Sequence, residues 1–152
     1  MIPPDLEFVF ELRVDIGPIV EVRKTSSGLE RHIPIMGGTF SGPRISGRVL
    51  PGGADRQFVE ESGLTLVDAQ YVLETQDGVR IEIENRGVRD GSPAVLQRLA
   101  AGEVVDPKEY YFRTTPRFHP RNGPYEWLKK CVFVASGERY ANLVVVKVWK
   151  VL

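Results

Sequence analysis

Apolar and polar residues alternate with a period of two along much of this chain. In LEFVFELRV, which begins at Leu6, every second residue is apolar, so Leu6, Phe8 and Phe10 are expected to share one face. The same alternation returns in VRIEIENR, from Val79 to Arg86. Strict alternation is typical of a β-strand that is buried on one side, whereas a helix would scatter these apolar residues around its axis. Both segments are therefore predicted to be strands with one face toward a core.

Less regular apolar runs predict further strands, and turn residues separate them. The remaining predicted strands cover Ile19–Lys24, Arg31–Ile35, Gly38–Gly42, Ile45–Leu50, Leu64–Thr75, Glu109–Thr115, Leu128–Ala135 and Tyr140–Val151. Gln76-Asp77-Gly78 contains the Asp-Gly pair that favours tight hairpins, because both residues tolerate positive φ. Ser136-Gly137-Glu138 is expected to turn the chain in the same way. The strands that flank each turn should therefore pair antiparallel.

One segment, GSPAVLQRLAAGEVVDP, has the pattern of a short helix. Ser92 can cap it, Pro93 suits the first helical position and Gly102 is placed to end it. Val95 and Leu99 contribute to an apolar stripe. A helix of about ten residues is marginal in isolation. We therefore expect it to dock this stripe over one edge or one open end of the sheet.

The predicted strands favour an all-β fold, a closed or nearly closed antiparallel β-barrel of about eight to ten strands with one short helix. Closure removes the exposed edges that so many short strands would otherwise present. A two-sheet sandwich is the main alternative, because strand count and hairpin spacing suit both folds. The 152 residues are expected to form a single domain, residues 1–152. A barrel of this size leaves room for one small ligand in its lumen or at its mouth.

Composition and charge restrict the classes of partner. Twenty basic residues balance twenty acidic ones, so the chain has no net charge with which to attract nucleic acid or an anionic membrane. The N-terminal segment has neither a basic leader nor an unbroken apolar run. Cys131 is the only cysteine, which excludes an internal disulfide and suits a reducing compartment. The sequence thus predicts a cytoplasmic protein with a small-molecule ligand and with neither a nucleic-acid nor a membrane partner.

Several kinds of catalytic or cofactor site find no support in the sequence. There is no Gly-rich phosphate loop, no dinucleotide fingerprint and no Gly-x-Ser-x-Gly motif. Cys131 lies in the apolar run KKCVFVA and is expected to be a core thiol. The two histidines, His32 and His119, are far apart, and neither has a second histidine at strand or helix spacing. We therefore expect neither a cofactor nor a metal ion.

Two segments supply candidate site residues. PGGADRQ, residues 51–57, turns the chain before Asp55, which is either a proton acceptor at a barrel mouth or an acceptor of backbone N–H groups in its own turn. EYYFRTTPRFHPRNGPYEWLKK, residues 109–130, is the densest aromatic and cationic part of the chain. Such a segment can stack on unpaired bases, but the neutral total charge argues against it. Period two places Tyr111 and Arg113 on one face. Arg113 can bind a carboxylate or phenolate if this face lines the lumen, and is an ordinary solvated arginine otherwise.

A series of motifs follows one order along almost the whole chain: GGTFSGP, PGGADRQ, LVDAQYVLETQDG, IENRG, YYFRTTPRF, YEWL and VFVASGER. Together they resemble a family of small uncharacterised proteins (domain of unknown function 3237, uncharacterised protein family 0311). The resemblance implies an antiparallel β-barrel of lipocalin-like shape without an agreed activity. The family pattern corresponds in this chain to Gly52, Gly53, Ala54, Asp55, Tyr71, Asn85, Gly87, Arg113, Thr114, Tyr125 and Trp127. Arg56, His119 and Lys129 differ from residues that are common in the family, which implies a pocket for a more anionic ligand.

Three functions remain open. The first is an isomerase, cyclase or lyase for an aromatic or carboxylate-bearing metabolite, with Asp55 as base, Arg113 as anion clamp and Tyr71 stabilising negative charge on the substrate. The second is a non-catalytic carrier with the same pocket. In both, the residues expected to contact the ligand are Gly53, Arg56, Tyr111, His119 and Trp127. The third is a structural or interaction protein, a homodimer or higher homo-oligomer, whose aromatic segment is an interface and whose barrel is filled.

Overall fold

The computed structural model describes residues 1–152, and β-strands account for most of them. The strands are β1 (Leu6–Ile16), β2 (Val20–Thr25), β3 (Gly28–Ser41), β4 (Ser46–Val49), β5 (Ala54–Glu60), β6 (Thr65–Thr75), β7 (Arg80–Gly91), β8 (Tyr110–His119), β9 (Phe133–Arg139) and β10 (Leu143–Val151). The connections contain one α-helix, α1 (Pro93–Ala100), and two 3-10 helices, η1 (Pro107–Glu109) and η2 (Glu126–Lys130). None of these helices is long and apolar enough to cross a membrane.

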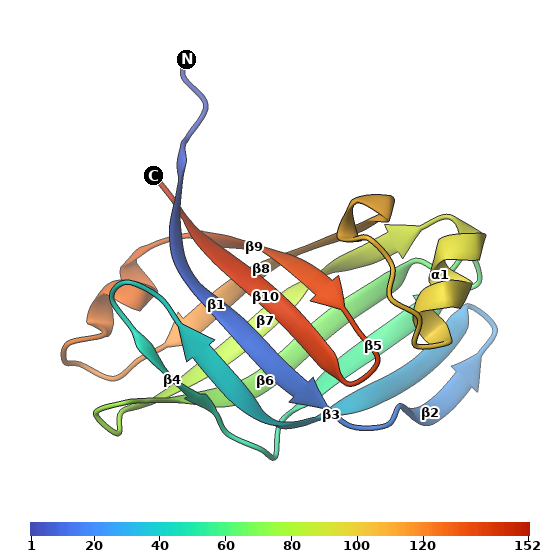
Figure 1. Ribbon diagram of the computed structural model, residues 1–152, viewed down its shortest axis with the longest axis horizontal. Coiled ribbons are helices and arrows are strands. Elements are labelled where there is room, and N and C mark those ends of the chain that lie inside the picture. Colours follow the sequence, from blue (N-terminus) through green and yellow to red (C-terminus); the bar gives the residue numbers. More distant parts are fainter.

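The strands curl into a closed antiparallel barrel (Figure 1). The strand order is β1-β10-β9-β8-β7-β6, after which β4 and β5 each pair with both β6 and β3. β3 also pairs with β1, which closes an eight-stranded barrel. β2 lies outside this circuit and pairs with β3 alone. The predicted barrel is therefore confirmed, and the sandwich alternative is wrong.

β5 is the strand that the alternation pattern did not predict, and it contains Asp55. The chain turns at Pro51 and Gly52, where Gly52 has a φ of 110°. Gly53 approaches β6 so closely that a Cβ atom there would lie 2.4 Å from the backbone oxygen of Gln70. Only glycine fits such a contact. The Gly-Gly pair therefore turns the chain and seats β5 against β6, so that Asp55 belongs to the barrel wall and not to a loop.

The strand bounds correct three other predictions. The segment predicted as a strand at Leu128–Ala135 begins within η2 (Glu126–Lys130), and β9 starts only at Phe133. Residues 136–138 do not form a turn but lie inside β9, and the turn to β10 comes at residues 140–142. A glycine is needed within β9 because a Cβ atom on Gly137 would lie 2.6 Å from the ring of Phe112. The two short strands predicted within residues 31–42 form one continuous strand, β3.

A β-bulge in β1 changes which residues face the core. The register between β1 and β10 shifts between Phe8 and Phe10. Phe10 is fully buried, whereas Leu6 is 54% and Phe8 42% exposed. On the outer face, Phe8 packs edge-on against Trp149, with 6.2 Å between ring centroids. The expectation that Leu6 and Phe8 share a face with Phe10 is wrong, because the bulge inserts one extra residue into the alternation.

Aromatic side chains fill one end of the barrel. Rings that pack against one another at centroid distances of 5.1 to 5.6 Å belong to Phe10, Phe40, Phe118 and Phe133. Leu128 of η2 is 1% exposed and joins this core, and η2 lies at the left end of the barrel in Figure 1. This end of the lumen therefore has no room for a ligand.

The predicted helix is confirmed, and it lies at the opposite end of the barrel (Figure 1). The Ser92 hydroxyl accepts a hydrogen bond of 3.3 Å from the backbone N–H of Val95, and Pro93 begins the helix. Leu99 packs in a small apolar cluster that includes Phe112 of β8. The helix thus packs beside the end of the barrel that the phenylalanines do not fill.

Replacing Phe10 by alanine should lower the free energy of unfolding by about 3–5 kcal/mol, because a buried ring is lost and a cavity remains. Phe8→Ala is the matched control on the same strand. It should cost only about 1 kcal/mol, the contribution of an exposed aromatic pair. Urea unfolding of the two variants measures both values. Equal losses would contradict the bulge.

Candidate functional site

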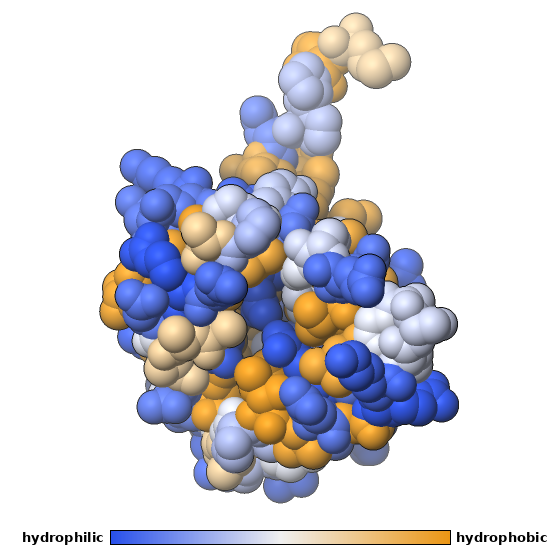
Figure 2. Space-filling model, turned by 90° about the vertical axis from the view of Figure 1, so that its right-hand side faces the viewer, coloured by the Kyte–Doolittle hydropathy of each residue, from blue (hydrophilic) through white to orange (hydrophobic).

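A cavity occupies the lumen between the phenylalanine core and the end beside α1. Seventeen residues line it, ten of them hydrophobic. Its empty volume is about 560 Å³, counting the part that is open to solvent. Because an eight-stranded barrel leaves little room between its inward side chains, the lumen is narrow and suits a small or flat molecule. Figure 2 shows the barrel end beside α1, where a hollow bordered by hydrophobic and hydrophilic residues leads inward.

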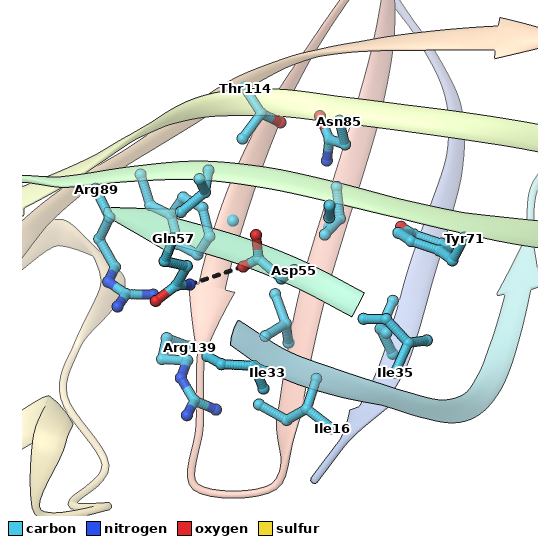
Figure 3. A pocket seen from close by; sticks show the side chains of 17 residues that line it. Ile16, Ile33, Ile35, Asp55, Gln57, Tyr71, Asn85, Arg89, Thr114 and Arg139 are labelled. Atoms are coloured by element: carbon cyan, nitrogen blue, oxygen red, sulfur yellow. Dashed lines mark hydrogen bonds between the residues drawn. The ribbon is translucent and has the colours of Figure 1, made fainter. Parts of the chain in front are cut away.

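Polar side chains from three strands enter the same part of this cavity (Figure 3). Asp55 of β5 pairs with Ala69 of β6, and Ala69 pairs with Asn85 of β7, so these inward positions form one row. The next row toward α1 contains Gln57 of β5 and Thr114 of β8. Every second residue of a barrel strand faces inward, so the strand pairing alone brings these residues together.

Asp55 is held by two hydrogen bonds from different strands. Its Oδ2 accepts one of 2.7 Å from Gln57 Nε2, and its Oδ1 accepts one of 3.1 Å from the backbone N–H of Asp68. Burial raises the pKa of the Asp55 carboxyl, since the lost hydration outweighs these hydrogen bonds and the attraction of Arg89, which lower it. Asp55 is thus a carboxyl that is easier to protonate than a surface aspartate, and it is not an acceptor within its own turn.

Gln57 connects Asp55 to a cation on β3. Its Oε1 accepts a hydrogen bond of 2.9 Å from Arg31 Nε, while its Nε2 donates to Asp55. Burial lowers the pKa of Arg31, and the attraction of Asp55 opposes this change. The two hydrogen bonds determine which end of the Gln57 amide faces the carboxyl. Gln57 therefore orients Asp55 and couples it to Arg31.

Two further arginines, Arg89 of β7 and Arg139 of β9, line the cavity and are labelled in Figure 3. Arg89 is only 6% exposed, and its guanidinium carbon lies 5.4 Å from the centroid of the Phe112 ring. Burial lowers the pKa of Arg89 to about 10, and repulsion by Arg139 and Arg31 contributes to this. Arg89 is therefore still charged at neutral pH. Arg139 donates hydrogen bonds to two backbone oxygens of the β9–β10 turn.

Tyr71, Asn85 and Thr114 complete the polar lining. Burial raises the pKa of Tyr71, and the nearby Asp55 raises it further, so its phenol stays protonated and can donate a hydrogen bond. Asn85 Oδ1 and Thr114 Oγ1 are buried and have no hydrogen-bond partner. Buried polar atoms almost always have one. Two unpartnered atoms on the wall of one cavity indicate that water or a ligand completes them.

The structure places only part of the predicted site in this cavity. Asp55 and Tyr71 line it, and Gly53 lies where β5 meets β6 beside Tyr71. Arg113 is exposed on the outer face, where its Nη1 donates a hydrogen bond of 2.9 Å to the backbone oxygen of Phe112. Of the two alternatives for Arg113, the structure shows the solvated arginine and not the anion clamp, because β8 turns the alternate residues, including Phe112 and Thr114, inward.

Four predicted ligand contacts also lie outside the cavity. Arg56 is exposed, and so is Tyr111, at 57%. His119 is exposed on β8, with its Nε2 3.7 Å from a glutamate oxygen of β7. Trp127 belongs to η2 at the filled end, and the guanidinium carbon of Arg44 lies 4.0 Å from its ring centroid.

Gln57, Arg89 and Arg139 are the cavity residues that the sequence interpretation missed. Counting every second residue of β7 from Ile81 leads through Asn85 to Arg89. The alternation alone could therefore have predicted that Arg89 faces inward. Gln57 was missed because β5 was interpreted as part of a turn. Arg139 was missed because a turn was predicted before it, within the actual β9.

The fold and cavity define a class of protein: a small closed antiparallel β-barrel that is filled at one end and, toward the other, contains a mainly apolar cavity with a few polar and charged side chains. Within this class, the chain belongs to the family described as protein of unknown function (DUF3237), whose model matches residues 4–151. The family resemblance of the motifs is thereby confirmed.

Individual relatives agree with this assignment. A UPF0311 protein from Rhodopseudomonas palustris (strain TIE-1) is 43% identical over 151 residues, which are 98% of this chain and 99% of the relative. The crystal structure of a conserved protein of unknown function from Rhodopseudomonas palustris has a TM-score of 0.95 and 40% identity, and covers 100% of both chains. The crystal structure of an enzyme from Penicillium herquei has a TM-score of 0.75 at 19% identity and covers 100% of this chain and 97% of that one, which shows a shared fold alone.

Asp55→Asn should change how stability depends on pH. Below the unfolded pKa of about 3.9, the carboxyl is protonated in both the folded and the unfolded state, so it does not change the free energy of unfolding. As pH rises from there to the folded pKa, the unfolded state ionises first and the free energy of unfolding falls. Above the folded pKa this loss is constant. The melting temperature of Asp55→Asn minus that of the wild type should therefore increase as pH rises through this window and then level off. Thermal unfolding between about pH 3 and pH 8 measures this difference.

Asp68→Asn, on the outer side of β6, is the matched control and should not show this increase. A difference between Asp55→Asn and wild type that decreases as pH rises would contradict the burial of the Asp55 carboxylate.

Proposed function

We propose that this protein binds a small organic molecule in the barrel lumen and transfers a proton on it through Asp55, as an isomerase, cyclase or lyase for an aromatic or carboxylate-bearing metabolite. The observation that carries this proposal is the setting of Asp55, a partly buried carboxyl whose pKa is raised by lost hydration, in a cavity that contains unpartnered atoms of Asn85 and Thr114. A raised pKa makes a carboxylate a stronger base and brings its proton exchange closer to neutral pH.

The proposed chemistry needs only the residues of the cavity wall. The Asp55 carboxylate accepts a proton from an acidic C–H or O–H group, and the electron pair moves onto a conjugated oxygen of the ligand. Arg89 and the neutral phenol of Tyr71 can stabilise this negative charge. Return of the proton to a different atom completes an isomerisation or ring closure, and loss of a leaving group that takes the electron pair completes an elimination. Gln57 holds the carboxylate in place throughout.

A non-catalytic carrier is the second candidate, because the apolar part of the lining can bind a ligand without any proton transfer. Ten of the 17 lining residues are hydrophobic, which favours binding of an apolar body in either case. The protein from Penicillium herquei has the same fold and is described as an enzyme, so it supports catalysis only by showing that such a barrel can belong to an enzyme. The third function, a structural protein with a filled barrel, is disfavoured by the cavity. Homo-oligomerisation and a cytoplasmic location stay predictions.

Asp55→Asn should abolish proton transfer and leave ligand affinity largely intact. Thermal-shift screening of phenolic and carboxylic metabolites identifies ligands, because a compound that binds only the folded form raises the melting temperature. For each ligand, NMR measures the exchange of its acidic C–H protons for deuterium in D2O. The wild type should accelerate this exchange, and Asp55→Asn should be slower by a factor of about 100 or more.

Asp68→Asn again serves as the control, because its side chain lies outside the lumen while its backbone N–H still reaches Asp55. It should exchange ligand protons at the wild-type rate. Ligands that bind but exchange no faster than in buffer would identify a carrier, and a wild-type rate in Asp55→Asn would reject Asp55 as the base.

A further inference from the structure

The cavity has an excess of positive charge. The charged side chains that line it are Asp55, Arg89 and Arg139, and Arg31 is joined to the same network through Gln57. Three arginines thus act on one cavity carboxyl, and the exposed Glu21 of β2 partly offsets the charge of Arg31, although the whole chain has no net charge. The arginines also repel one another, since each of Arg31 and Arg139 contributes to lowering the pKa of Arg89. The interior of this barrel is therefore suited to an added negative charge.

Arg89 forms no direct ion pair, unlike arginines on the outside of the same barrel, and Asp55 attracts it only from a longer distance. On the outer face, Arg86 Nε lies 3.4 Å from Asp68 Oδ1, and Arg48 Nη2 lies 2.8 Å from Glu74 Oε1. Arg89 is 6% exposed and forms neither an ion pair nor a hydrogen bond through its side chain. A charge that is buried without a partner destabilises the fold. Pairing between Arg89 and an anionic group of a bound ligand would explain why the fold contains this unpaired arginine.

The unpartnered atoms of Asn85 and Thr114 independently indicate a ligand in the same cavity. Both side chains are more than nine-tenths buried, at 4% and 5% exposed. Asn85 is four residues from Arg89 on β7, which corresponds to about 13 Å along a strand. Apolar residues of β1, β3 and β10 line the lumen as well. The lining therefore matches a molecule with an anionic end, a flat apolar body and a second hydrogen-bonding group.

We propose that the cavity binds a small organic carboxylate in one orientation, with its carboxylate at Arg89 and Arg139 near α1 and its body extending past Asp55 toward Asn85 and Tyr71. This inference rests on the proposed function, because it assigns a substrate class to the same site. A carboxylate is planar and matches the planar guanidinium group with two parallel hydrogen bonds, which suits a narrow lumen. The orientation places the central part of the ligand, where a proton would be removed, beside Asp55.

Binding of three probes tests the substrate class: cinnamate, its uncharged analogue cinnamamide, and phenyl phosphate. Isothermal titration calorimetry of the wild type should give an affinity for cinnamate at least about tenfold above that for cinnamamide, the equivalent of one charge-assisted hydrogen bond. Phenyl phosphate should bind more weakly than cinnamate. Equal affinity for cinnamate and cinnamamide, a preference for phenyl phosphate, or no binding of cinnamate would overturn the proposal.

Arg89→Met tests the residue, with Arg86→Met as the matched control on the outer face of the same strand. Arg89→Met should lose the preference for cinnamate over cinnamamide, whereas Arg86→Met should keep it. Asp55→Asn should bind cinnamate at least as tightly as the wild type, since a nearby negative charge is removed. Unchanged cinnamate affinity in Arg89→Met would reject the anion site.

A measurement without ligand separates binding from structural support. Removing an unpaired buried charge should raise the melting temperature of free Arg89→Met by roughly 2–4 °C, and Arg86→Met should show no such gain. A lower melting temperature for Arg89→Met would assign Arg89 a structural role and overturn the site. The proposed proton transfer can fail while the anion site is correct. If cinnamate binding depends on Arg89 but no deuterium exchange depends on Asp55, the anion site is supported and Asp55 is rejected as the base.

Discussion

The width of an eight-stranded barrel is the constraint on which the site depends. Such a barrel is just wide enough for inward side chains to fill, so a cavity exists only where those side chains are small. Large rings, among them Phe10 and Phe118, fill one end completely. Toward α1, Ala69 and Gly137 stand at inward positions, where Gly137 makes room for the Phe112 ring, and both line the cavity. The position of the cavity is therefore a consequence of side-chain volume at a few positions of the wall.

Closure of the barrel also determines the electrostatics of the site. Polar groups inside the lumen lose most of their hydration, and this single cause acts in opposite directions on the two kinds of charge. It raises the pKa of Asp55 and lowers the pKa of Arg89, so both groups are less stable in their charged forms than at the surface. Gln57 and the backbone of β6 compensate Asp55 in part through hydrogen bonds, whereas Arg89 has no such direct contact and only the attraction of Asp55 and Tyr110 opposes the lowering of its pKa. That asymmetry is why the site favours an anionic ligand.

The success of sequence-based prediction followed the regularity of the alternation. β6 was predicted, and β7 as far as Arg86, because most of their inward residues are apolar and an Asp-Gly turn joins them. β5 was missed because Asp55 and Gln57 occupy inward positions where the pattern calls for apolar residues. Gly137 was interpreted as a turn residue for a similar reason, since it makes room for Phe112 within a strand. Residues that build a cavity interrupt the pattern by which strands are recognised.

The sequence by itself determined that the chain consists of antiparallel strands with one capped helix, and its motifs identified the family. These features depend on local alternation and on short turn and capping signals, which a single strand or helix contains in full. Only the tertiary structure decided which polar residues share the lumen. β8 has aromatic residues on both faces, so its own pattern could not show that Thr114 faces inward and Arg113 outward. That choice depends on how β8 pairs with β7 and on the space above Gly137 of β9, and pairing between strands is a property of the closed barrel.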